Sequence, residues 1–102
     1  MLFRSGLLSR NAGIKVAKET EIINKLGLHA RPCAKFVKLA NTFRSEVWVG
    51  KDDDTVNGKS IMGLMMLAAG NGSRLMITCE GSDAAQALEA IEKLILSKFD
   101  ED

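Results

Sequence analysis

The sequence predicts an α+β fold, an open-faced β-sandwich with the element order β-α-β-β-α-β-α. Four short segments have the patterns of strands, and three others repeat small or apolar residues at helical spacing. The short connections favour an antiparallel sheet covered on one face by the three helices. With 102 residues the chain is expected to form one small domain at 15–102. Residues 1–14 lack periodicity and are expected to form a flexible extension before it.

The first two elements are predicted on either side of a turn. Lys15–Ile23 alternates loosely and ends on two isoleucines, which is consistent with a strand, and Asn24–Gly27 forms the turn. A helix is expected from Ala30 to Thr42, because Pro32 suits a first helical turn and apolar residues then recur at helical spacing.

The middle of the chain is predicted to form two strands and a second helix. Glu46–Val49 is the second strand, and Thr55–Val56 is a short third strand after the turn at Gly50–Asp54. Ser60 is a good N-cap for a helix that runs from Ile61 to about Ala69 and is stopped by the glycines that follow.

The last strand has the clearest pattern and precedes the last helix. Arg74–Glu80 alternates between apolar and polar residues, as a half-buried strand does. Ser82 is expected to cap the helix, with Asp83 in the first turn, where its charge suits the helix dipole. The stripe expected to face the core consists of Ala84, Ala87, Leu88, Ile91 and Ile95.

His29 is the only histidine, and it lies at or just before the N-cap of the first helix. Free backbone N–H groups and the positive end of the helix dipole face such a position, which attracts phosphate. Arg31 adds a planar donor, and imidazole is a nucleophile near neutral pH. These features predict that His29 carries a phosphoryl group in a cradle formed by Ala30 and Arg31. On this evidence alone, a surface histidine without a role stays an alternative.

Composition excludes several other classes of protein. The two cysteines form no CxxC pair, which indicates free thiols in a reducing compartment. No apolar run approaches the ~20 residues of a membrane span, and the N-terminus lacks the apolar block of a signal peptide. A cytoplasmic protein without membrane insertion is expected. A metal site is not expected, because His29 and Cys33 lack an evident third ligand.

Charge is distributed unevenly along the chain. Residues 1–51 hold ten Lys or Arg against three Asp or Glu, whereas residues 52–102 hold four against ten. Nucleic acid is the obvious alternative partner for a basic surface near His29. It is not favoured, because aromatic residues are few and no recognisable reading motif is present.

Two segments, GLHARPCAKFVKLA and VNGKSIMGLMMLAA, carry a family resemblance. They match, in order, the two signature regions of the HPr family, the histidine-containing phosphocarrier proteins of the bacterial sugar phosphotransferase system. The resemblance covers roughly residues 15–102. It implies a sheet with the strand order 1-4-2-3 and a phosphoryl group on Nδ1 of His29.

The resemblance also implies the partners. The chain would accept the phosphoryl group from the phosphohistidine of enzyme I, itself charged by phosphoenolpyruvate, and pass it to IIA-type proteins. It would be a monomeric carrier without a cofactor, not a stand-alone enzyme. Two rivals are the nitrogen-related branch of the family and a purely regulatory binding module. The second fits less well, because members specialised in that way lack the histidine.

Ser60 has a second implied role besides capping. In organisms with the matching HPr serine kinase/phosphorylase, the family carries a regulatory phosphate on the serine that matches Ser60. A nucleotide-binding loop is rejected, because the pattern GxxxxGK[ST] would require glycine where Asp53 stands.

The second helix is too short to bury all its apolar residues against one sheet. Leu64 and Leu67 are the better core candidates, whereas Ile61, Met62 and Met65 are expected to form an adaptable docking patch. Cys33, where the family commonly has alanine or serine, is expected to be a small buried side chain. The alternative is a thiol with a lowered pKa in the first helical turn.

Overall fold

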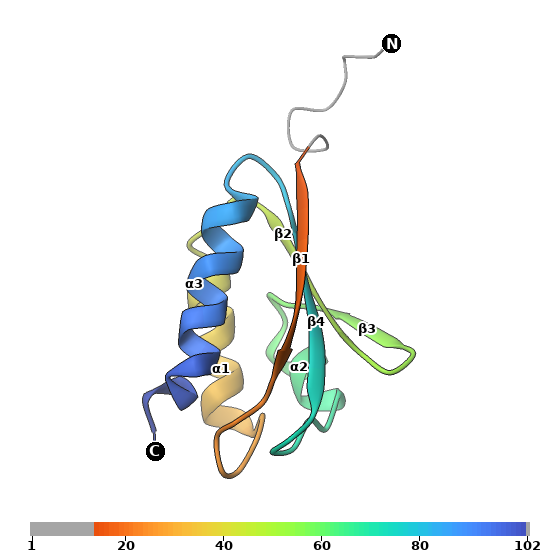
Figure 1. Cartoon of the computed structure of the whole chain (residues 1–102), viewed down its shortest axis with the longest axis vertical. Coiled ribbons are helices and arrows are strands. Elements are labelled where there is room, and N and C mark those ends of the chain that lie inside the picture. Colours follow the sequence, from red (N-terminus) through yellow and green to blue (C-terminus); the bar gives the residue numbers. More distant parts are fainter. Residues whose placement is uncertain (1–13, 102) are drawn as a thin grey trace.

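The computed structural model describes residues 14–101, which form a four-stranded antiparallel sheet with helices packed against one face (Figure 1). The strand order β1-β4-β2-β3 confirms the order that the family resemblance implies. The elements are β1 (Lys15–Glu21), α1 (Ala30–Ala40), β2 (Glu46–Lys51), β3 (Asp54–Asn57), α2 (Ile61–Met66), β4 (Arg74–Glu80), α3 (Ala84–Leu96) and a short 3₁₀ turn, η1 (Lys98–Asp100).

β4 lies at the centre of the sheet and shows why the alternating pattern predicted a strand. It pairs with β1 on one side and with β2 on the other. Leu75, Ile77 and Cys79 are buried beneath the helices, while Met76 is exposed on the opposite face. The period of two therefore separates a core face from a solvent face.

Three predicted boundaries differ from the observed ones by two or three residues. The first strand ends at Glu21, not Ile23: the Ile22 N–H donates to the carbonyl of Ser73, and the Ile22 carbonyl accepts from Gly72. α1 ends at Ala40 rather than Thr42. α2 ends at Met66 rather than near Ala69, because Ala68 adopts a left-handed backbone with φ of 50°.

The hairpin strands are longer than predicted. β2 continues to Lys51, and β3 spans Asp54–Asn57. The left-handed conformation of Asp52, with φ of 56°, allows a tight turn between the two strands. Gly50, Lys51 and Asp54, which the sequence predicted in the turn, therefore pair between the strands instead.

The start of α3 corrects a predicted role. Asp83, not Ser82, is the N-cap residue, and its side chain makes no capping bond. Its carboxylate instead accepts from the N–H groups of Arg44 and Ser45 and from the Ser45 hydroxyl, at 2.9, 3.0 and 2.5 Å. These bonds lower the pKa of Asp83, and the bond from the Ser45 hydroxyl has the largest effect. The carboxylate thus fixes the entry to β2 rather than the helix end.

The core lies between the sheet and the helices. Leu88 of the predicted α3 stripe is only half-buried, whereas the other four members are fully buried. Phe36 of α1 and Phe99 of η1 are the largest fully buried side chains. Further fully or nearly fully buried residues are Ile22, Cys33, Val47, Val49, Leu64, Leu67, Leu75, Ile77 and Cys79.

The chain after α3 turns in an unusual way. Lys98, Phe99 and Asp100 all have left-handed backbones, with φ of 58°, 56° and 59°. Left-handed conformations cost roughly 1–2 kcal/mol in helical residues other than glycine, so other interactions must hold this turn. The burial of Phe99 is one of them.

Ile14, the last residue of the expected extension, is bonded to the loop after β4. Its carbonyl accepts a hydrogen bond from the Gly81 N–H at 2.9 Å. The rest of the predicted extension, residues 1–13, lies outside the described residues.

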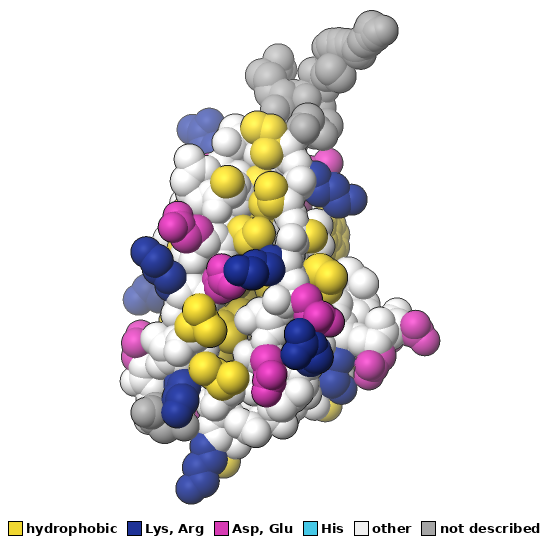
Figure 2. Space-filling model, in the orientation of Figure 1, with side chains coloured by type: hydrophobic (Ala, Val, Ile, Leu, Met, Phe, Trp, Pro, Cys, Tyr) yellow, Lys and Arg dark blue, Asp and Glu magenta, His cyan; other side chains and the backbone are white. Residues whose placement is uncertain are grey.

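The opposite charges of the two halves of the chain lie side by side on one face of the folded domain. On the face in Figure 2, Lys and Arg side chains are interspersed with Asp and Glu side chains. Between residues 14 and 101, no helix has the length and apolar character needed to cross a membrane.

Candidate phosphoryl-transfer site

His29 occupies the N-cap position of α1, as the sequence predicted. Its backbone is extended, and its side chain makes no capping hydrogen bond. Its carbonyl accepts the first helical bond, from the Cys33 N–H at 3.1 Å. The imidazole is 38% exposed, so it is open to a second protein, while the helix start fixes only the backbone that carries it.

Free donors follow His29 directly. Pro32 has no N–H, and the N–H groups of Ala30 and Arg31 have no partner in the part of the chain that the structure describes. Arg31 is exposed, and within residues 14–101 its guanidinium makes no ion pair. The two amides and the guanidinium can therefore all serve an anion beside the ring.

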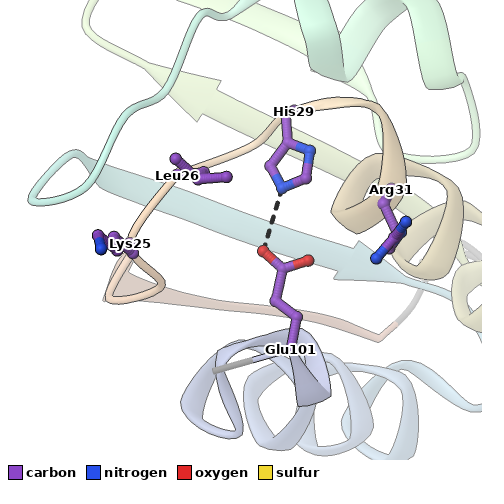
Figure 3. Close-up of a pocket in the computed structure, with 5 residues that line it drawn as sticks. All are labelled: Lys25, Leu26, His29, Arg31 and Glu101. Atoms are coloured by element: carbon purple, nitrogen blue, oxygen red, sulfur yellow. Dashed lines mark hydrogen bonds and ion pairs between the residues drawn. The ribbon is translucent and has the colours of Figure 1, made fainter.

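The ring lies in a shallow hollow lined by Lys25, Leu26, His29, Arg31 and Glu101 (Figure 3). Lys25 and Leu26 come from the turn after β1, and Arg31 comes from the first turn of α1. Two cationic side chains beside an open imidazole favour the approach of a phosphate group.

Glu101 is the site residue that the sequence analysis missed. Its Oε1 lies 3.1 Å from Nε2 of His29 and also accepts from Nδ2 of Asn24 at 3.1 Å. The hydrogen bond from His29 lowers the pKa of Glu101. Partial burial opposes this shift, and the hydrogen bond from Asn24 adds to it. Glu101 is thus a carboxylate at neutral pH. The two residues are 72 positions apart, and no sequence pattern indicates that they meet.

The loop before His29 is joined to the second signature segment. The Leu28 N–H donates to the carbonyl of Ala69 at 2.8 Å. Gly27 has a φ of 72°, and a Cβ there would lie 2.6 Å from the Ala69 oxygen. Glycine is therefore required both for the backbone conformation and for the close approach.

Ser60 is the N-cap of α2, as predicted. Its hydroxyl oxygen accepts from the Gly63 N–H at 3.0 Å, and its side chain is partly exposed. The segment before it is held by Lys59, whose Nζ donates to the carbonyl of Phe43 at 2.9 Å.

The exposed apolar residues of α2 separate from the core residues as predicted. Leu64 and Leu67 are buried, while Ile61, Met62 and Met65 are 42%, 75% and 44% exposed. Met66, which was not assigned to the docking patch, is also exposed. We name the four exposed residues, Ile61, Met62, Met65 and Met66, the α2 patch.

Cys33 is a buried core side chain, and the alternative of a low-pKa thiol is wrong. Burial raises the pKa of its thiol to about 11, and Sγ lies 3.6 Å from the carbonyl oxygen of Leu28. The thiol is buried in the core, whereas His29 and Arg31, from the same helix start, line the hollow.

Comparisons with known proteins agree with this geometry. Residues 16–97 match the family model described as PTS HPr component phosphorylation site. The phosphocarrier protein HPr of Neisseria meningitidis serogroup A is 57% identical over 81 residues, which are 79% of this chain and 91% of that protein. The HPr-like protein Crh of Halalkalibacterium halodurans is 51% identical over 76 residues, or 74% of this chain and 90% of that protein.

Solved structures give the same assignment. A crystal structure of HPr from Thermoanaerobacter tengcongensis superposes with a TM-score of 0.83 at 47% identity, covering 85% of this chain and 98% of that one. A crystal structure of HPr from Bacillus anthracis gives 0.77 at 51% identity, covering 79% and 96%. The chain therefore belongs to the HPr family of phosphocarrier proteins of the phosphotransferase system.

Proposed function

We propose that this phosphocarrier holds its phosphoryl group on Nδ1 of His29. The lone pair of Nδ1 would form a bond to phosphorus while the bond between phosphorus and the donor histidine of enzyme I breaks and returns its electron pair to that ring. The observation that carries the proposal is the combination at the start of α1: a 38% exposed imidazole, with two amides and a guanidinium that have no partner among residues 14–101.

Arg31, with the amides of Ala30 and Arg31, would bind the three phosphoryl oxygens. These donors are fixed by the helix start, so they need little rearrangement when the phosphate arrives. Transfer is then mainly a matter of alignment between donor and acceptor nitrogens. The open hollow supports this, because a second protein must reach the phosphorus from outside.

The chain would serve as a carrier rather than an enzyme in its own right. Its phosphoryl group is gained from enzyme I and lost to a IIA-type protein, so each molecule is a stoichiometric intermediate. The α2 patch supports this role, because flexible methionine side chains adapt to more than one partner. A cytoplasmic location, inferred from free thiols, belongs to the same proposal.

Ser60 is proposed as a regulatory phosphorylation site for an HPr serine kinase. Its partly exposed hydroxyl lies beside Ile61 and Met62, so a phosphate would place negative charge at the edge of the α2 patch. The monomeric state stays a prediction, because HPr from Thermoanaerobacter tengcongensis has also been crystallised as a dimer.

The test is phosphorylation by purified enzyme I and phosphoenolpyruvate, followed by addition of a IIA-type protein. We expect acid-labile, base-stable phosphate on the wild type, discharge on addition of the acceptor, and no phosphate on His29→Ala. Phosphate that accumulates on the wild type but cannot be discharged to any IIA-type protein would favour the purely regulatory alternative.

A further inference from the structure

The segment after α3 places one carboxylate, that of Glu101, against the ring of His29. After α3 the backbone makes the left-handed turn at 98–100, and Glu101 then points back toward the start of α1 (Figure 3). Oε1 of Glu101 meets Nε2, the ring nitrogen that does not carry the phosphoryl group in the proposed function. The inference below rests on that proposed function.

Two contacts hold the turn in place. The Phe99 side chain is fully buried in the core. Its carbonyl accepts a hydrogen bond from Nζ of Lys35 at 2.6 Å, which ties the turn to α1. A turn of three left-handed residues persists only where its surroundings determine it, and here the Lys35 bond ties the turn to the helix whose N-cap is His29.

Asn24 holds the carboxylate from the other side. It is fully buried, and its Nδ2 donates both to the carbonyl of Gly27 at 2.8 Å and to Oε1 of Glu101 at 3.1 Å. The same oxygen therefore lies between a fixed amide and the imidazole. Such an arrangement fixes the position of the carboxylate rather than leaving a mobile surface pair.

The charges around the ring give this contact a chemical use. Lys25 and Arg31 line the hollow, and Lys35 lies close enough to act on the Glu101 carboxylate. These cations suit a phosphate, but they oppose positive charge on the imidazole. Glu101 is the one carboxylate among the five residues that line the hollow.

We propose that Glu101 is a positioning residue for phosphoryl transfer, accepting the Nε2–H of His29 so that Nδ1 keeps its lone pair and the ring tolerates positive charge. When Nδ1 bonds to phosphorus, the ring retains the Nε2 proton and becomes a phosphoimidazolium. The carboxylate stabilises this cation, as a buried aspartate stabilises the imidazolium of a catalytic triad. Because the protonated ring is the better leaving group, the same contact keeps the phosphoryl group transferable.

The single histidine allows a direct test by NMR of protein labelled with ¹⁵N at histidine. Three variants separate the effects of Glu101. Glu101→Ala removes both the acceptor and the charge, whereas Glu101→Gln keeps an acceptor oxygen. Asp100→Asn removes the same charge from the neighbouring exposed residue and, with asparagine, tolerates the left-handed backbone.

When His29 is unphosphorylated and its ring is uncharged, we expect only the Nε2–H tautomer in the wild type, in Glu101→Gln and in Asp100→Asn. Glu101→Ala should show a measurable fraction of the Nδ1–H form. In the phosphorylated protein, the proton affinity of Nε2 should fall about tenfold in both Glu101 variants and stay unchanged in Asp100→Asn. The initial rate of phosphorylation should fall about tenfold in Glu101→Ala.

An unchanged ring in Glu101→Ala, in both forms of the protein, would overturn the proposal. An equal drop in Asp100→Asn would also overturn it, because the effect would then be one of general charge. If the wild type accepts no phosphoryl group at all, the proposed function fails, and the tautomer of the unphosphorylated ring still decides whether Glu101 positions His29.

Discussion

The Leu28 N–H donates a hydrogen bond to the carbonyl of Ala69 over 2.8 Å, and this bond joins the two signature segments of the chain. The loop before His29 is thereby fixed to the segment after α2. The phosphoryl-transfer site and the α2 patch consequently share one support. A partner that binds the methionines would meet the imidazole in a fixed relation to them.

Gly27→Ala should destabilise the domain by about 2 kcal/mol or more, because it combines a left-handed backbone with a contact of 2.6 Å to the Ala69 oxygen. Chemical denaturation measures this free energy of unfolding. Gly70→Ala is the matched control, since a Cβ at Gly70 meets nothing within 4 Å. Equal stability of the two variants would show that the loop yields easily at Gly27.

Arg31→Lys should slow phosphorylation by enzyme I roughly tenfold, a loss of about 1.4 kcal/mol of transition-state stabilisation. Lysine keeps the charge but loses the planar fork of donors. Stopped-flow or rapid-quench transfer rates measure the effect. Arg44→Lys, a change to an exposed arginine outside the hollow, should leave the rate unchanged. Equal rates for wild type and Arg31→Lys would mean that the backbone amides suffice.

Met62→Gln should weaken binding to enzyme I about tenfold with little change in melting temperature, because Met62 is 75% exposed and its loss leaves the core intact. Calorimetric titration and thermal melts measure the two effects. Met76→Gln is the control: Met76 is also exposed but lies on the sheet face opposite the helices. If only Met76→Gln weakened binding, the docking surface would lie on the sheet and not on the α2 patch.

The native thiols should resist alkylation at pH 8. Burial raises the pKa values of Cys33 and Cys79 to about 11, so the thiolate is scarce and inaccessible. We expect reaction with iodoacetamide at least a hundredfold slower than in guanidinium, where both cysteines should react. One thiol that reacts in the native state as fast as in the unfolded state would contradict the assigned burial.

The predicted features that the structure reproduces are those set by local chemistry. The alternation over Arg74–Glu80, the hydroxyl of Ser60 as a cap and the helix start at Ala30 each depend on neighbouring residues. The separation of Leu64 and Leu67 from the exposed methionines follows from the limited surface of one short helix.

The features that the sequence did not predict depend on distant residues. Asp83 was expected to support its own helix, but its carboxylate bonds to Arg44 and Ser45, which precede it by 39 and 38 positions. The left-handed turn around Phe99 contains no glycine that would have indicated it. Glu101 therefore reaches His29 through packing that only the folded chain provides.

The position of the phosphoryl group on the ring tests the central claim most directly. Protein labelled with ¹⁵N at histidine, phosphorylated by enzyme I and phosphoenolpyruvate, should show coupling between ³¹P and Nδ1 of His29, because Nε2 is occupied by Glu101. Coupling to Nε2, or stable phosphate on another residue with the ring of His29 unchanged, would contradict the account.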